Sequence, residues 1–173
     1  MDKAYKFLDI GADMILIVED IAHNTGTFIS PQALRSEIFP YMRWQAERIK
    51  LHRDVPLFFH SDGDLNSVMQ DIIACGYDGL QSLQPSANMD IADIKARYGD
   101  RLCLMGNIDI NYVLPFGTPQ EVKQVVKETI EVAAPGGGFI LSTCNTLIRA
   151  IPPENALAMY RAADEYGVYP IGE

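Results

Sequence analysis

The chain has 173 residues, of which 48% are hydrophobic and 21% charged, and its formal net charge is −9 at pH 7. This composition is typical of one globular domain with a buried core, so we treat residues 1–173 as a single domain. An acidic chain without a lysine or arginine cluster does not fit a nucleic-acid partner, and its apolar runs are too short to span a membrane.

The cysteines give an expectation about the compartment. Cys75, Cys103 and Cys144 are widely spaced and form no Cys-x-x-Cys pair, which favours a reducing cytoplasm over a disulfide framework. The N-terminus also lacks the apolar stretch of a signal peptide. We therefore expect a cytoplasmic protein.

Short apolar runs alternate along the chain with helical patterns, beginning with residues 1–10, which resemble the end of a helix. The runs are mostly continuous rather than alternating, as expected of parallel strands that are covered on both faces. They comprise residues 14–18, 55–59, 79–83, 102–105 and 139–141.

Helices are predicted between these runs from capping residues, prolines at the first helical position and terminal glycines. Ser30-Pro31 begins one that runs toward Leu51, and Thr118-Pro119 begins one that runs to about Ala133. The others cover residues 64–74, 90–98 and 153–166. Strict alternation of strand and helix predicts a parallel sheet with right-handed crossovers.

A repeated unit indicates a barrel. Before the first and the third apolar run, a helix stops at a glycine (Gly11, Gly76) and an aspartate (Asp13, Asp78) leads into the strand. The predicted fold class is therefore α/β, of the (β/α)8 TIM-barrel type, with this chain supplying about five βα units. An open sheet of that size leaves two free edges, so we expect a fragment, a homo-oligomer or an N-terminal half-barrel partner.

Polar residues gather just after the apolar runs, where ligands bind in parallel α/β folds. His60 and Asp62 are two residues apart and face the same side of a strand. Glu19 or Asp20 could add a third ligand, and we assign Glu19, so that these residues form a candidate site for a divalent metal such as zinc, or a proton-transfer group that works without metal. Asp109 is a further catalytic candidate, although it is equally suited to cap a helix. Candidate substrate-binding residues are Asp20, Gln84, Asn107, Cys144 and Asn145.

No nucleotide cofactor is expected. Gly136-Gly137-Gly138 precedes an apolar run instead of following one, which is the wrong place for a dinucleotide-binding loop and indicates a tight turn.

Several stretches, taken in this order, resemble the uroporphyrinogen decarboxylase superfamily: residues 59–64, 104–109, 117–122, 134–138, 151–155 and 165–167. The resemblance implies a TIM barrel that acts on a small-molecule substrate. It is greater to the branch of methyltransferases that work with corrinoid proteins than to the porphyrinogen decarboxylases. It covers nearly the whole chain.

In that methyltransferase branch a His-x-Cys pair and a later cysteine bind zinc and activate a thiol acceptor. Here His60 is retained, Asp62 stands in the first cysteine position and Gly137 in the second. The resemblance therefore implies a histidine–carboxylate site, and methyl transfer between a corrinoid protein and a small acceptor such as a folate. Porphyrinogen decarboxylation and a non-catalytic half-barrel that needs a partner chain remain open alternatives.

Overall fold

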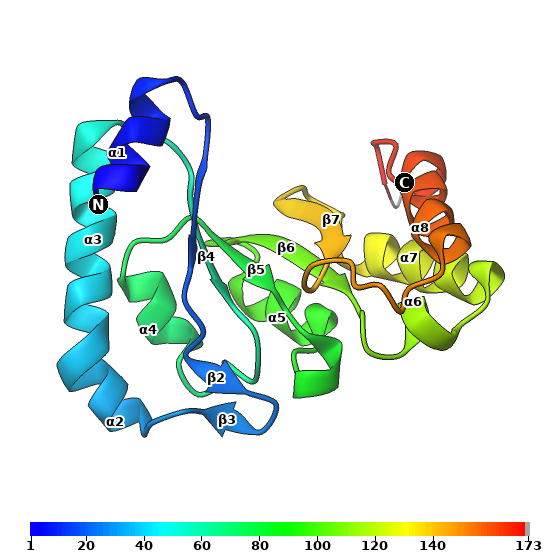
Figure 1. The fold of residues 1–173 in the computed structure, drawn as a ribbon, viewed down its shortest axis with the longest axis horizontal. Coiled ribbons are helices and arrows are strands. Elements are labelled where there is room, and N and C mark those ends of the chain that lie inside the picture. Colours follow the sequence, from blue (N-terminus) through cyan, green and yellow to red (C-terminus); the bar gives the residue numbers. More distant parts are fainter. Residues whose placement is uncertain (172–173) are drawn as a thin grey trace.

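The computed structural model describes residues 1–171 and contains a five-stranded parallel sheet (Figure 1). Its spatial order is β1-β4-β5-β6-β7, the order of the strands in the sequence, so each crossover returns the chain to the next position in the wall of a barrel. This confirms the predicted fold class as a partial α/β barrel. The strands are β1 (Ile15–Val18), β4 (Leu57–Ser61), β5 (Gly79–Ser82), β6 (Cys103–Ile108) and β7 (Phe139–Thr143).

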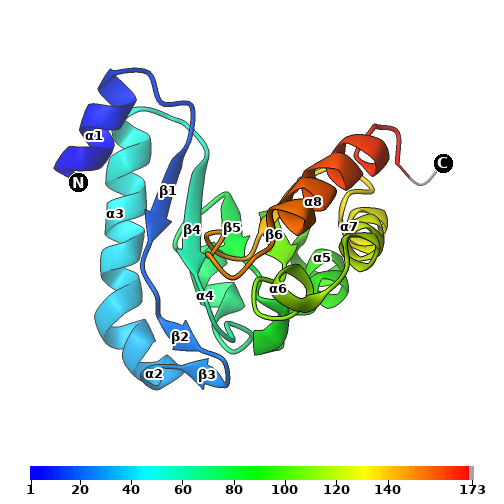
Figure 2. The ribbon, with the colours of Figure 1, turned by 45° about the vertical axis from the view of Figure 1, so that its right-hand side comes forward.

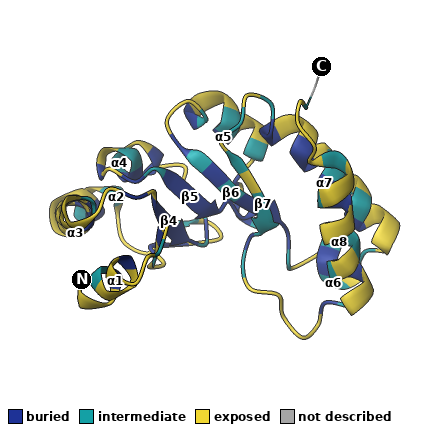
Figure 3. Cartoon of the chain, turned by 90° about the horizontal axis from the view of Figure 1, so that it is seen from above, coloured by how far each residue is buried: buried dark blue, intermediate teal, exposed yellow. Residues whose placement is uncertain are grey.

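Helices form an arc along one face of the curved sheet, as the view from above shows for α3, α4, α5 and α7 (Figure 3). Within residues 1–171, no helix has the length and apolar character that crossing a lipid bilayer requires. The helical segments are α1 (Asp2–Asp9), α2 (Pro31–Ala33), the π-helical η1 (Leu34–Ile38), α3 (Phe39–His52), α4 (Met69–Ala74), the 3₁₀ segment η2 (Pro85–Ala87), α5 (Ile91–Tyr98), α6 (Val113–Phe116), α7 (Pro119–Ala133) and α8 (Pro153–Tyr166).

Two predicted helices differ from the structure near their starts. The helix expected from residue 64 begins at Met69, because the Asp64 side chain accepts a bond from the Asn66 amide and holds a local turn instead. The helix that begins after Ser30 passes through a π-helical turn before α3. Pro40, at the start of α3, has no N–H to donate to the preceding turn, which accounts for the change of register.

A short hairpin, β2 (Ala22–His23) and β3 (Gly26–Thr27), was not predicted. It lies beyond the end of β1 and beside α2 (Figure 2). The amide of Asp64 donates to the carbonyl of His23 at 2.9 Å, so the hairpin is bound to the loop that follows β4.

The apolar interior is divided into a larger and a smaller core. The larger contains Phe59 and Leu80 and spreads from α1 to the middle of β6. The smaller contains Val126 and Met159 and lies between the end of β6, α6, α7 and α8. Phe139 packs against both, so β6 and β7 form the boundary between them.

The other face of the sheet carries a row of side chains set by the strand register: Val18, His60, Gln81, Met105 and Ile140. Val18 is 60% exposed and Ile140 is 40% exposed, although both are apolar. β1 pairs with β4 on one side and has no partner on the other among residues 1–171. The inner face and the β1 edge of this partial barrel are therefore uncovered.

Candidate functional site

Three predicted residues meet at the carboxyl ends of β1 and β4. Nε2 of His60 lies 3.7 Å from Oδ1 of Asp20 and 3.9 Å from Oδ1 of Asp62. One ligand atom from each residue lies within 4.8 Å of the others. His60 is the penultimate residue of β4, and the two aspartates lie just beyond β1 and β4. The ends of neighbouring parallel strands therefore create the group.

The two carboxylates are held in place by donors from other strands. Oδ1 of Asp62 accepts a bond from the Ser82 hydroxyl at 2.6 Å, and its Oδ2 accepts a bond from the Asn145 amide. The backbone N–H of Asp62 donates to Oδ1 of Asp20 at 3.0 Å. These bonds orient the carboxylates before any ligand is present.

The donor set fits a divalent cation. One imidazole nitrogen and two carboxylate oxygens are ligands that zinc accepts, and three protein ligands leave a position open for a substrate. His60 is buried, and among residues 1–171 its Nε2 has no hydrogen-bond donor facing it, only the two acidic side chains. A cation, or a proton on Nε2, would balance the negative charge that gathers there.

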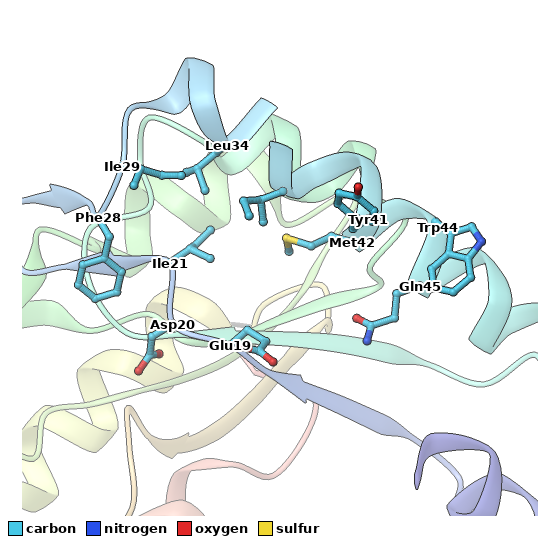
Figure 4. A pocket seen from close by; sticks show the side chains of 11 residues that line it. Glu19, Asp20, Ile21, Phe28, Ile29, Leu34, Tyr41, Met42, Trp44 and Gln45 are labelled. Atoms are coloured by element: carbon cyan, nitrogen blue, oxygen red, sulfur yellow. The ribbon is translucent and has the colours of Figure 1, made fainter. Parts of the chain in front are cut away.

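Glu19 is placed differently from the prediction that made it a metal ligand. It contacts His60 through the backbone, where its N–H donates to the His60 carbonyl at 3.1 Å, and Asp20 supplies the carboxylate beside the imidazole instead. Figure 4 shows Glu19 and Asp20 at the rim of a mostly apolar pocket of about 470 Å³ that extends to Met42 and Trp44 on α3.

A second pocket, of about 420 Å³, lies beside the acidic group and is lined by amide and hydroxyl side chains. It brings together four predicted residues, Asp62, Gln84, Cys144 and Asn145. The amide oxygen of Gln84 accepts a bond from the Gly63 N–H at 3.2 Å, and its nitrogen donates to Asn24 and Ser86. We call this the amide pocket; its lining residues are Asn24, Asp62, Gln84, Ser86, Ile110, Asn111, Tyr112, Cys144 and Asn145.

The sequence reasoning missed Asn24, Ser86, Asn111 and Tyr112 as pocket residues. Asn24 belongs to the unpredicted hairpin, although Asn24-Thr25-Gly26 has the composition of a turn that could have revealed it. The others lie on loops that follow β5 and β6, and their position depends on how those loops fold back.

Asn107 and Asp109 line a neighbouring pocket on the α7 side, together with Thr129. The amide nitrogen of Asn107 donates to backbone carbonyls of the segment that follows β5. Oδ1 of Asp109 accepts from the N–H groups of Asn111 and Tyr112 at 2.7 and 2.6 Å. Asp109 thus holds the turn that leads into α6, and its catalytic role stays a prediction.

Cys144 is buried, and this burial raises the pKa of its thiol to about 11. At neutral pH the side chain is therefore an uncharged thiol that forms part of the pocket wall, rather than a thiolate that binds metal. Its backbone carbonyl accepts a bond from the Gln81 amide at 3.3 Å.

Comparison with known proteins places the chain in a family. The family described as uroporphyrinogen decarboxylase (URO-D) matches residues 2–166. Methylcobamide:CoM methyltransferase MtaA of Methanosarcina barkeri is 29% identical over 167 residues, which make up 94% of this chain and 44% of the relative. Uroporphyrinogen decarboxylase of Chlorobium phaeovibrioides is 31% identical over 153 residues, 86% of this chain and 40% of the relative.

A solved structure described as a methyltransferase from Methanosarcina mazei superposes with a TM-score of 0.77 at 24% sequence identity. The match covers 95% of this chain and 45% of that one, which supports the partial-barrel fold. The chain thus spans less than half the length of the relatives it matches. With a family match from residue 2 to residue 166, the chain belongs to the uroporphyrinogen decarboxylase (URO-D) family.

Proposed function

We propose that this chain is part of an enzyme that transfers a methyl group between a corrinoid protein and a small acceptor such as a folate. In this proposal Asp20, His60 and Asp62, which we call the metal group, hold a divalent metal. The observation that carries it is the meeting of one imidazole nitrogen and two carboxylate oxygens at the strand ends, within 4.8 Å of one another. The similarity to a methylcobamide methyltransferase over 94% of this chain supports the reaction class.

The reaction requires an activated acceptor atom. The methyl group leaves cobalt when the Co–C bond breaks with both electrons remaining on cobalt, and a lone pair of the acceptor forms the new bond to carbon. The acceptor's proton, where it has one, passes to water, since the half-exposed Asp20 side chain shows that the group is open to solvent. A divalent metal at the group would lower the pKa of an acceptor bound to it.

The carboxylates make this site harder than one built from thiolates, and so favour an acceptor that binds through nitrogen or oxygen. The amide pocket shares Asp62 with the metal group, so a substrate there can reach the reacting atoms. Its side-chain amides donate and accept hydrogen bonds, which suits an uncharged ring with several polar atoms.

Porphyrinogen decarboxylation is supported by the 31% identity to a uroporphyrinogen decarboxylase. The lining of the site favours it less. No lysine or arginine of the described chain lines the amide pocket, the pocket beside Asp109 or the inner-face pocket of His60 and Gln81. A substrate with several carboxylates would need such cations to replace its hydration.

A half-barrel that needs a partner is the second candidate, and the uncovered inner face favours it. Leu16, Val18 and Ile140 are 36%, 60% and 40% exposed, and the free edge of β1 presents unpaired backbone groups. A second half-barrel that paired with β1 would cover both. Size-exclusion chromatography with light scattering tests self-pairing: a dimer is expected, and a monomer at every concentration would reject it.

Zinc titration by calorimetry tests the metal site. The purified chain should bind one Zn²⁺, and Asp20→Asn and Asp62→Asn should each weaken binding by at least about tenfold, since each removes an anionic ligand. Glu19→Gln is the matched control, because it removes the neighbouring carboxylate that lies outside the group. Equal losses in Glu19→Gln and Asp20→Asn would contradict the geometry.

Methyl transfer is followed by the visible spectrum of methylcobalamin in the presence of zinc and tetrahydrofolate. The proposal expects the methylcobalamin bands to decline with wild-type protein and to persist with Asp62→Asn. Zinc binding without any methyl transfer would reject the activity for this chain alone and favour the half-barrel alternative.

A further inference from the structure

Gln81 contacts the His60 side chain but belongs to neither the metal group nor the amide pocket. The two residues are register partners on β4 and β5 and point to the same inner face. Both are buried, with 8% of each residue exposed. Nδ1 of His60 is in hydrogen-bond contact with Oε1 of Gln81.

The orientation of the Gln81 amide follows from its other contacts. Its nitrogen lies 3.2 Å from the carbonyl oxygen of Thr143 and 3.3 Å from that of Cys144. Carbonyl oxygens only accept hydrogen bonds, so the amide nitrogen must face them and donate both of its hydrogens. The amide oxygen then faces His60, and it too can only accept.

This arrangement fixes where the His60 proton lies. Because Oε1 of Gln81 accepts, Nδ1 of His60 must be the N–H that donates. In the neutral ring, Nε2 then carries a lone pair, and that lone pair faces the carboxylates of Asp20 and Asp62. Without Gln81, the opposite tautomer would be favoured, since an Nε2–H would be attracted electrostatically by the two carboxylates, whose nearest oxygens lie 3.7 and 3.9 Å from Nε2.

We propose that Gln81 is a positioning residue that holds the proton of His60 on Nδ1. The lone pair of Nε2 is then free to bind a ligand on the side of the ring where Asp20 and Asp62 lie. Strand β7 takes part, because its last residue, Thr143, and the residue after it supply the carbonyls that orient the amide. That a cation binds next to Nε2 rests on the proposed function, whereas the position of the proton on the His60 ring does not depend on it.

Nitrogen-15 NMR of the metal-free protein tests the proposal, because the two imidazole tautomers give different nitrogen shifts and different couplings to the ring protons. The chain has three histidines, so the His60 signals can be assigned by their loss in His60→Gln. At a pH where the ring is neutral, wild-type His60 should carry its proton on Nδ1. Observation of the Nε2–H tautomer in wild type would overturn the proposal.

Three variants separate positioning from general support of the fold. Gln81→Met keeps the length of the side chain but removes the acceptor, and should move His60 to the Nε2–H tautomer. Gln81→Glu keeps an oxygen that can accept from Nδ1 but loses the N–H groups that donate to the two carbonyls, and it should retain the Nδ1–H tautomer. If Gln81 only supported the fold, Gln81→Glu would not preserve this tautomer. Gln124→Met, which removes a glutamine of α7 whose amide donates to Glu128 on the same helix, is the control and should leave the His60 signals unchanged.

Zinc affinity supplies a second readout. Loss of a residue that orients a metal-bound histidine typically weakens binding by about 10–100-fold, and we expect a loss in that range for Gln81→Met. The two proposals can fail separately. A wild-type Nδ1–H tautomer without zinc binding would remove the metal but keep the role of Gln81. Zinc binding with an unchanged His60 tautomer in Gln81→Met would remove the role of Gln81 but keep the metal.

Discussion

Gly63 lies between the metal group and the β2–β3 hairpin. Alanine substitutions at Gly63 and at Gly76 can be compared to isolate the effect of packing on the free energy of unfolding. The φ of Gly63 is +91°, and a Cβ there would lie 2.6 Å from the carbonyl carbon of Ala22 and 2.7 Å from backbone atoms of His23. Carbon atoms normally approach to about 3.5–4.0 Å, and backbone atoms cannot turn aside as a side chain can. Gly76 has the same φ of +91°, and a Cβ there would meet nothing within 4 Å.

The two alanine variants should therefore differ in stability. Both incur a left-handed backbone penalty of about 1–2 kcal/mol. Gly63→Ala should lose about 1–3 kcal/mol more, the usual range for overpacking, because the hairpin has to move. Urea unfolding followed by circular dichroism measures both free energies of unfolding. Equal losses, within about 0.5 kcal/mol, would refute the argument that the hairpin is packed rigidly against Gly63.

Three further predictions concern stability elsewhere. Thr118→Ala should lower the free energy of unfolding by about 1 kcal/mol, since it removes the side-chain cap on the Glu121 amide; urea unfolding measures this, and no change would count against the cap. Asn155→Ala should lower the thermal midpoint, because its buried amide donates to the backbone carbonyls of Leu114 in α6 and of Gly117 just after it; a midpoint within error of wild type would contradict this. Burial raises the pKa of both Cys75 and Cys144 from 9.0 to about 11, so the unfolded thiols ionise first. The stability that these two thiols contribute is fully present below pH 9 and should fall as pH rises toward 11. The double alanine variant should show a weaker dependence in urea midpoints across that range, and part of it should remain because burial also raises the pKa of Cys103 and Tyr77; an unchanged dependence would contradict the role of the two thiols.

The elements that local chemistry determines could be predicted from the sequence. Thr118, Pro119 and Glu121 form a cap within four residues, and α7 begins and ends as expected. Asp90 likewise caps α5, accepting from the N–H of Ala92 at 2.8 Å. The hairpin strands could not be found in this way, because two residues are too few to show an alternating pattern, and only the turn composition of residues 24–26 marks the hairpin in the sequence.

The candidate site, too, could be predicted from the sequence only in part. His60 and Asp62 could be paired in advance because alternation along a strand places both on one face. The choice between Glu19 and Asp20 could not be made, because β1 ends at Val18 and strand alternation no longer applies beyond it. Asn145 meets Asp62 across 83 residues of sequence, a contact that depends on the curvature of the whole sheet.

The division of the interior into two cores means that the site spans two regions that can differ in local stability. Asp20, His60 and Asp62 lie at the ends of β1 and β4, strands of the larger core, whereas Asn145 lies on the segment that leads from β7 to α8 and the smaller core. Parts of a protein commonly open with a smaller free energy than global unfolding. An opening of the smaller core that included the end of β7 would withdraw the amide of Asn145 from Asp62 and the carbonyls of Thr143 and Cys144 from Gln81. The fraction of molecules with an ordered site at any moment would then depend on helices that contribute no residue to the metal group.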